Sequence, residues 1–181
     1  MVNAITIFIS GLSTFIMIGN IILFDFDTDT SFNSWTIVDD VVMGGRSQGE
    51  FSIDKDGFGV FSGEVSLENN GGFSSLRHRL SGVDCSGFGK FLLKIKGDGK
   101  KYQFRVKSSQ SDYHSYIYEF KTSGDWQEIE ISFGSMYPGF RGRKLNIPNY
   151  PGDEASEIAF LIGNKKSEKF KLLIDFIKVV N

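Results

Sequence analysis

Residues 35–47 read Trp-Thr-Ile-Val-Asp-Asp-Val-Val-Met-Gly-Gly-Arg-Ser, and the chemical character of the chain changes twice within them. They begin with aromatic and β-branched residues, which favour a strand. Two adjacent aspartates and a glycine pair follow, and these types are typical of a loop. One interpretation is a polar binding site, and the other is a tight turn in which the aspartates accept backbone hydrogen bonds. The candidate site residues are Asp39, Asp40, Gly44, Gly45 and Arg46.

Apolar and polar residues alternate through most of the chain after Phe51, and a period close to two is typical of half-buried strands. In residues 91–96, for example, the apolar side chains fall on one face and the lysines on the other. Besides a strand that begins at Trp35, strands are predicted over residues 22–26, 49–53, 59–68, 72–80, 88–96, 102–107, 116–122, 127–132, 158–162 and 170–179. So many short strands, separated by turns rich in Gly, Asp and Asn, indicate an all-β sandwich or barrel.

The length of 181 residues suits one domain. We therefore predict a single β-sandwich domain over residues 22–181, preceded by an apolar segment over residues 1–21. The chain contains 21 Gly and 18 Phe. This composition favours many turns and an aromatic core, because large rings dominate the packing energy of such domains.

Residues 1–24 carry no charged side chain and are long enough to cross a bilayer. Three interpretations are open: a secretory signal, a membrane anchor, or an extension upstream of a domain whose natural start lies near Met17. The first two would export the protein or attach it to a membrane through residues 1–24. The third would leave it in the cytoplasm.

Charge and cysteine content exclude several classes of partner. A net charge of −2 provides no field that attracts nucleic acid, so no nucleic-acid partner is expected. Cys85 is the only cysteine, and with His78 and His114 it makes a poor metal-binding set. Loop aspartates suit calcium, but no dense acidic loop motif accompanies them. We expect neither a metal site nor a cofactor.

Catalysis is not expected either. Asp39 and Asp40 are adjacent, so in an extended strand their side chains point to opposite faces and cannot act as a facing acid and base. A bulge or turn that redirects one of them would remove this objection. Neither His78 nor His114 lies in a nucleophile-elbow motif. We therefore predict no catalytic residues and no enzyme.

Three further polar groups are candidates for binding. They are Asn69 and Asn70, in the turn before Arg77 and Arg79; Arg105 with Tyr116 and Tyr118; and Arg141 with Arg143. Two tyrosines on one strand face, together with an arginine, offer the ring stacking and hydrogen bonding that a carbohydrate needs. Paired arginines in a loop are suited to a carboxylate or a phosphate, although solvated loop arginines explain the same residues.

Several segments together resemble the complex I intermediate-associated protein 30 family. Besides residues 35–47, they are Leu23–Phe26, Phe61–Ser75, Gly97–Tyr102, Trp126 and Phe140–Arg143, in the family's order. The resemblance implies a jelly-roll β-sandwich of the galactose-binding-domain-like type, related to carbohydrate-binding modules and without established catalysis. It also implies a role in assembling a respiratory NADH dehydrogenase complex, with subunits of that complex as protein partners.

Two functional hypotheses follow. The first is a non-catalytic binding or assembly module that presents the Asp39–Ser47 loop and neighbouring polar loops to a protein partner. The alternative is a carbohydrate-binding module, which would be favoured by exposed Tyr116, Tyr118 and Arg105 on a concave sheet face. Buried tyrosines would count against the alternative.

Overall fold

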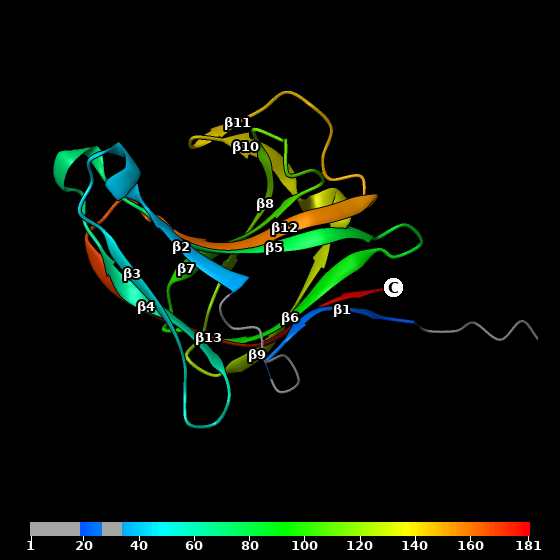
Figure 1. Cartoon of the computed structure of the whole chain (residues 1–181), viewed down its shortest axis with the longest axis horizontal. Helices are drawn as coiled ribbons and strands as arrows, with labels where there is room; N and C mark the ends of the chain where they lie inside the picture. Colours follow the sequence, from blue (N-terminus) through cyan, green and yellow to red (C-terminus); the bar gives the residue numbers. More distant parts are fainter. Residues whose placement is uncertain (1–18, 27–33) are drawn as a thin grey trace, which may run out of the picture.

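The computed structural model describes residues 19–26 and 34–181, and two antiparallel sheets pack face to face in it as a β-sandwich (Figure 1). The all-β sandwich expected from the alternating sequence is confirmed. None of the helices in the described ranges is long and apolar enough to cross a bilayer. The apolar segment over residues 1–21 falls almost wholly outside these ranges, so its three interpretations stay predictions.

The first sheet has six strands. Its order is β3 (Gln48–Ile53), β4 (Gly59–Val65), β13 (Glu168–Val180), β6 (Lys90–Lys96) and β9 (Trp126–Ser132), with β1 (Ile21–Asp25) also paired to β13. The long strand β13 holds both β4 and β1 along one side, at residues 168–174 and 176–179, and β6 along the other. It therefore joins all the parts of this sheet.

The second sheet has seven strands. Its order is β11 (Arg143–Lys144), β10 (Tyr137–Phe140), β8 (Ser115–Lys121), β7 (Lys101–Lys107), β12 (Glu154–Ile162), β5 (Ser74–Asp84) and β2 (Trp35–Asp39). Short 3-10 helices lie between strands of the described ranges, among them η2 (Asp40–Met43), η3 (Glu68–Asn70) and η4 (Phe133–Ser135). The sheet curves, so that η2 and η3 stand on one side of its outer face and β10 and β11 on the other (Figure 1).

The core lies between the two sheets and is rich in phenylalanine, as expected. Phe61, Phe91, Phe104 and Phe160 are completely buried, and edge-on or tilted ring contacts join several of them. Alternation places the next side chain of each strand on an outer face. The outer face of the seven-stranded sheet therefore carries polar side chains such as Arg77 and Arg105 among small and apolar ones.

The sequence patterns did not predict β10 or β11. The segment Tyr137-Pro-Gly-Phe140 lacks apolar and polar alternation, and proline and glycine are uncommon inside strands. Strand β12 also begins earlier than predicted, at Glu154. The polar residues Ser156 and Glu157 near its start are buried in the fold, so they interrupt the alternation that the prediction used. Both differences lie in the seven-stranded sheet.

Candidate functional site

Asp40 sits at the centre of the Asp39–Ser47 segment, which we call the signature loop, and its side chain is completely buried. One carboxylate oxygen accepts a hydrogen bond from the Ser47 backbone N–H at 2.9 Å. The other accepts from the Ser47 hydroxyl and from the N–H groups of Gly72, at 2.6 Å, and Phe73, at 3.1 Å. Burial alone would raise the pKa of Asp40, but these hydrogen bonds outweigh it and hold the pKa below its ordinary value. Both oxygens are thus used within the fold.

The glycine pair fits closely around this carboxylate. Gly44 ends η2 at a φ of 90°, which side chains rarely adopt. A Cβ on Gly45 would lie only 2.2 Å from the nearer Asp40 oxygen. These contacts support the structural-turn interpretation of Asp40, Gly44 and Gly45.

Asp39 has a related role at the end of β2. One of its oxygens accepts a hydrogen bond from the Gly49 N–H at 2.8 Å, so it connects β2 to the start of β3. Asp39 lies on the inner face of its sheet, whereas Asp40 has already entered η2. The turn at this point redirects Asp40 toward the loop of residues 71–73, so the two carboxylates serve separate loops.

Apolar side chains occupy the outside of the signature loop. Val41, Val42 and Met43 are 58%, 75% and 60% exposed, and Leu67 on the adjoining loop is 44% exposed. We call these four residues the apolar tip. Beside it, Arg46 forms an ion pair with Glu68 at 2.8 Å, which links the two loops. The pair is well exposed and contributes little stability, so it marks the polar rim of the tip.

Asn69 and Asn70 lie in η3, next to the apolar tip, and both are exposed. Their φ angles are 54° and 61°, a left-handed conformation that asparagine tolerates better than most residues. The structure therefore brings this predicted pair close to the signature loop. Arg77 does not join them, because its strand carries it to the outer face of the seven-stranded sheet.

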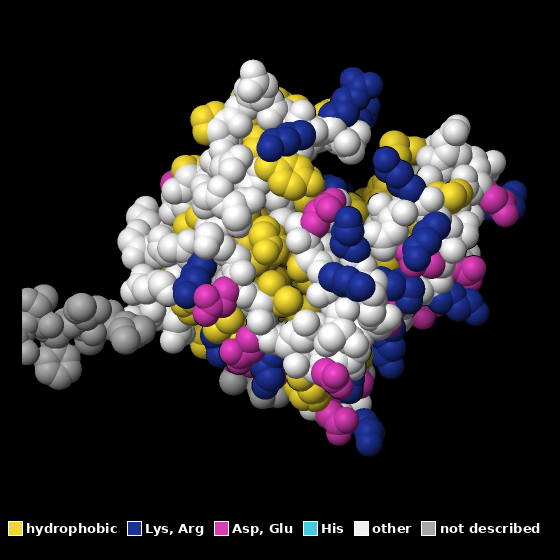
Figure 2. All heavy atoms as spheres, turned by 180° about the vertical axis from the view of Figure 1, so that it is seen from behind, with side chains coloured by type: hydrophobic (Ala, Val, Ile, Leu, Met, Phe, Trp, Pro, Cys, Tyr) yellow, Lys and Arg dark blue, Asp and Glu magenta, His cyan; other side chains and the backbone are white. Residues whose placement is uncertain are grey.

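A second group of polar residues lies on that outer face. The strand pairings align six residues in one row across the sheet: Thr36, Arg77, Ala159, Arg105, Ile117 and Tyr137. Figure 2 shows a hollow in the surface here, between the projection formed by β10 and β11 and the one formed by η2 and η3. Along β12 the floor is almost inaccessible, with Ala159 4% exposed.

The predicted grouping of Arg105 with Tyr116 and Tyr118 on one face is wrong. The tyrosines pair with Val106 and Phe104, which face the core, so their rings lie on the opposite side of the sheet from Arg105. Both rings are half-buried and pack against the core. By the criterion stated above, this position counts against them as a carbohydrate platform. The tyrosine that does share the row of Arg105 is Tyr137, on the strand that the sequence patterns missed.

Arg105 is held in place by a chain of side chains. Its Nε and Nη2 donate to the Gln103 Oε1 at 2.9 and 2.6 Å. The Gln103 amide donates in turn to Glu119 at 3.1 Å, and Glu119 also pairs with Lys101 at 3.3 Å. Burial, with the nearby charge of Arg77, lowers the pKa of Arg105 to about 10. Gln103 and Glu119 are site residues that single-strand alternation could not select, because only strand pairing brings them together.

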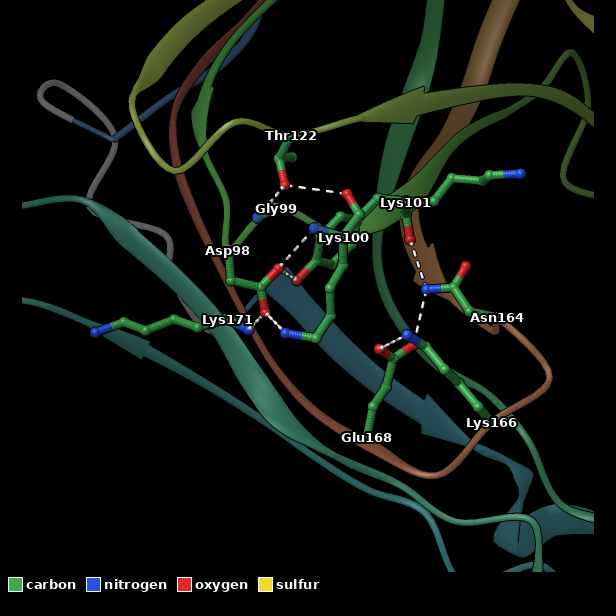
Figure 3. Close-up of polar contacts among 10 residues, drawn as sticks. Asp98, Gly99, Lys100, Lys101, Thr122, Asn164, Lys166, Glu168 and Lys171 are labelled. Atoms are coloured by element: carbon green, nitrogen blue, oxygen red, sulfur yellow. Dashed lines mark hydrogen bonds and ion pairs between the residues drawn. The ribbon is translucent and has the colours of Figure 1, made fainter.

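A cavity of about 570 Å³ adjoins this face, lined by Gln103, Glu119 and Leu161 and by the loops around Gly99 and Asn164. Figure 3 shows the polar contacts that fix those loops. The Asp98 carboxylate accepts hydrogen bonds from Lys100 at 2.6 Å and from the Lys171 N–H at 2.9 Å.

On the other loop, the Asn164 amide donates to the Lys101 carbonyl at 3.1 Å and to Glu168 at 2.8 Å (Figure 3). Lys166 pairs with the same glutamate at 3.1 Å. Lys100 and Lys166, which line the cavity, are thus paired with the carboxylates of Asp98 and Glu168.

Arg141 and Arg143 lie at the tight connection between β10 and β11, and both are exposed. The Arg141 guanidinium stands 5.2 Å from the centre of the Phe140 ring. Their positions agree with solvated loop arginines near one edge of the hollow. In the part of the chain that the structure describes, no three Asp, Glu, His or Cys side chains converge in a way that could hold a metal ion.

Comparison with known proteins gives a family and a fold. A family profile described as Complex I intermediate-associated protein 30 matches residues 24–174. The mouse (Mus musculus) protein Complex I intermediate-associated protein 30, mitochondrial, is 25% identical over an alignment of 181 residues that covers 87% of this chain and 55% of the mouse protein. The chain therefore spans about half the length of that relative.

Among solved structures, similar folds occur in carbohydrate-binding modules. A family 11 module of a cellulosomal cellulase of Clostridium thermocellum has a TM-score of 0.65 and 21% identity, covering 91% of this chain and 95% of the module. The family 11 module in complex with a β-1,3-1,4-mixed-linked tetrasaccharide has a TM-score of 0.64 and 21% identity, covering 91% and 96%. At this identity the similarity establishes a shared jelly-roll sandwich.

Proposed function

Because the chain belongs to the Complex I intermediate-associated protein 30 family, we propose that it is a non-catalytic binding module that takes part in assembling a respiratory NADH dehydrogenase complex. The partner would be a protein subunit or assembly intermediate of that complex. The observation that supports this proposal is the apolar tip, because large apolar side chains held out in solvent are typical of protein interaction sites.

The geometry of the tip favours binding in a second way. Asp40 fixes the loop from inside through four hydrogen bonds, so the loop is ordered before any partner arrives. A preformed surface loses less conformational entropy on association than a flexible one. The ion pair between Arg46 and Glu68 supplies a polar rim around the apolar centre, which is the usual anatomy of an interface.

Affinity capture with a matched pair of variants tests this proposal. Val42→Asp places a charge at the most exposed position of the tip, and Ile147→Asp places one at an exposed apolar residue outside the tip. Both variants should melt like the wild type. We expect Val42→Asp to lose subunits of the respiratory complex, identified by mass spectrometry, and Ile147→Asp to retain them. Equal capture by the two variants would contradict a role for the tip.

Carbohydrate binding is a second candidate function, and the row that contains Tyr137 and Arg105 favours it. A half-buried ring beside hydrogen-bonding side chains in a hollow suits a sugar. The test is calorimetric titration with a β-1,3-1,4-linked glucan tetrasaccharide. Binding that Tyr137→Ala abolishes, and that Trp126→Ala on the other sheet leaves intact, would support it. No heat of binding, or equal loss in both variants, would contradict it.

A further inference from the structure

Two arginines face each other across one small residue on the outer face of the seven-stranded sheet. Ala159 on β12 pairs with Arg77 on β5 and with Arg105 on β7. Neighbouring strands lie about 4.8 Å apart, so the two arginine backbones are separated by roughly 10 Å. Ala159 places only a methyl group between them and is 4% exposed, and both arginine side chains are half-buried.

The adjacent row of the same sheet is built differently. There Glu157 takes the central position, and it pairs with Arg79 on one side and Lys107 on the other. That row carries an acidic residue between two basic ones. The row of Ala159 also has a cation on each side of its central residue, but that residue is an alanine and not a glutamate.

The protein balances the charges of Arg77 and Arg105 only in part, through the charge of Glu119 acting on Arg105. Among residues 19–26 and 34–181, neither guanidinium forms an ion pair with a carboxylate. Arg105 donates to the neutral amide oxygen of Gln103, which satisfies two N–H groups without cancelling the charge. Glu119, the acidic residue of that series of side chains, already accepts a hydrogen bond from Gln103 and forms an ion pair with Lys101. Burial is the main cause of the lowered pKa of Arg105, and the neighbouring charge of Arg77 adds to it.

We propose that Arg77 and Arg105 bind an oxyanion, either a carboxylate or a phosphate group of a small ligand, in front of Ala159. Guanidinium groups present paired N–H donors in a plane that matches such groups. The bond to Gln103 fixes the orientation of Arg105 and leaves its Nη1 for the ligand. This site goes beyond the proposed protein partner, because it lies on the sheet face and not at the apolar tip.

Titration of the full chain with inorganic phosphate, glucuronate and neutral glucose tests the site, with the arginine side-chain N–H signals followed by NMR. We expect phosphate or glucuronate to shift the Arg105 Nε–H signal. The anion that binds more tightly identifies whether the natural ligand offers a phosphate or a carboxylate. Arg77→Gln and Arg105→Gln should each weaken binding by about tenfold or more, as expected for charge-assisted hydrogen bonds. Lys171→Gln, at an exposed position of the other sheet, should leave it unchanged.

A substitution at Ala159 provides a test that needs no ligand. Ala159→Glu would place a tethered carboxylate between the two arginines, and Ala159→Gln has the same size without the charge. We expect Ala159→Glu to have the higher melting temperature of the two and to abolish anion binding. An equal or lower melting temperature would overturn the proposal. So would anion binding that survives loss of both arginines, or glucose binding as strong as that of glucuronate.

Discussion

A single carboxylate organises the segment by which the family is recognised. Asp40 lies at the centre of a loop whose outer residues are apolar and exposed, and its hydrogen bonds reach both Ser47 and the loop of residues 71–73. Because the Ser47 donors are buried and those of Gly72 and Phe73 are half-buried, removing the acceptor would leave them poorly satisfied. At this scale, the residue that looks most functional in the sequence holds in place the apolar tip, which is the surface proposed to bind a partner.

Asp40→Asn should lower the free energy of unfolding by about 3 kcal/mol, because an amide has one acceptor oxygen and adds a donor where several donors already converge. Denaturant titration measures the loss. Asp56→Asn is the matched control, since Asp56 is an exposed turn residue, and it should change stability by less than about 0.5 kcal/mol. Comparable losses in the two variants would contradict the buried-acceptor role.

The contribution of Asp40 should also depend on pH. Its pKa in the folded protein is below the ordinary value of 3.8, so its ionised form is favoured by folding. The stabilisation is fully present above pH 3.8 and is lost as the pH falls through the lower folded pKa. The stability difference between wild type and Asp40→Asn should therefore shrink in acid, which urea titrations at a series of pH values would show. A constant difference would show that the charge is not involved.

The strand β2 shows what the sequence could and could not predict at the scale of elements. The strand predicted from Trp35 onward is present, and the Trp35 ring lies in the core, where it contacts Phe26 and His78. Alternation along one strand says nothing about which residue of a neighbouring strand lies opposite, because strand pairing depends on contacts distant in the sequence. For this reason the sequence patterns group Arg105 with Tyr116 and Tyr118, which lie on the other face of the sheet. They do not select Tyr137, because its strand lacks alternation.

Trp35→Ala should lower the free energy of unfolding by about 3–5 kcal/mol, the usual cost of removing a large buried ring. The ring is 7% exposed and stacks at 4.9 Å from His78. Trp126→Ala is the comparison, because that ring is 36% exposed on the outside of the other sheet. Its loss should be about 1 kcal/mol. Denaturant titration measures both losses. A loss below about 1 kcal/mol for Trp35→Ala would contradict the core position of this ring.

At the scale of the whole molecule, the sandwich combines a rigid frame with two separate surfaces. The apolar tip and the arginine row belong to different loops and strands, so each can be altered without the other. Their common support is the core between the sheets, which also encloses Cys85. Burial raises the pKa of the Cys85 thiol, and the side chain is completely inaccessible.

Cys85 should therefore report on opening of the whole domain. In native buffer a thiol reagent should modify it at a rate set by unfolding, and modification should become rapid at the denaturant concentration where fluorescence shows the fold is lost. Stopped-flow absorbance gives both rates. Rapid modification of the native protein would contradict the enclosed position of Cys85, and Cys85→Ser provides the blank.

The position of β13 has a consequence for synthesis of the protein on the ribosome. In the described part of the chain, β3 pairs with β4 and β6 pairs with β9, and β13 lies between these two pairs and also holds β1. A nascent chain that has not yet emerged as far as Glu168–Val180 would contain two unconnected halves of a sheet with exposed edges. Folding of this sheet must therefore wait until residues 168–180 have left the ribosome.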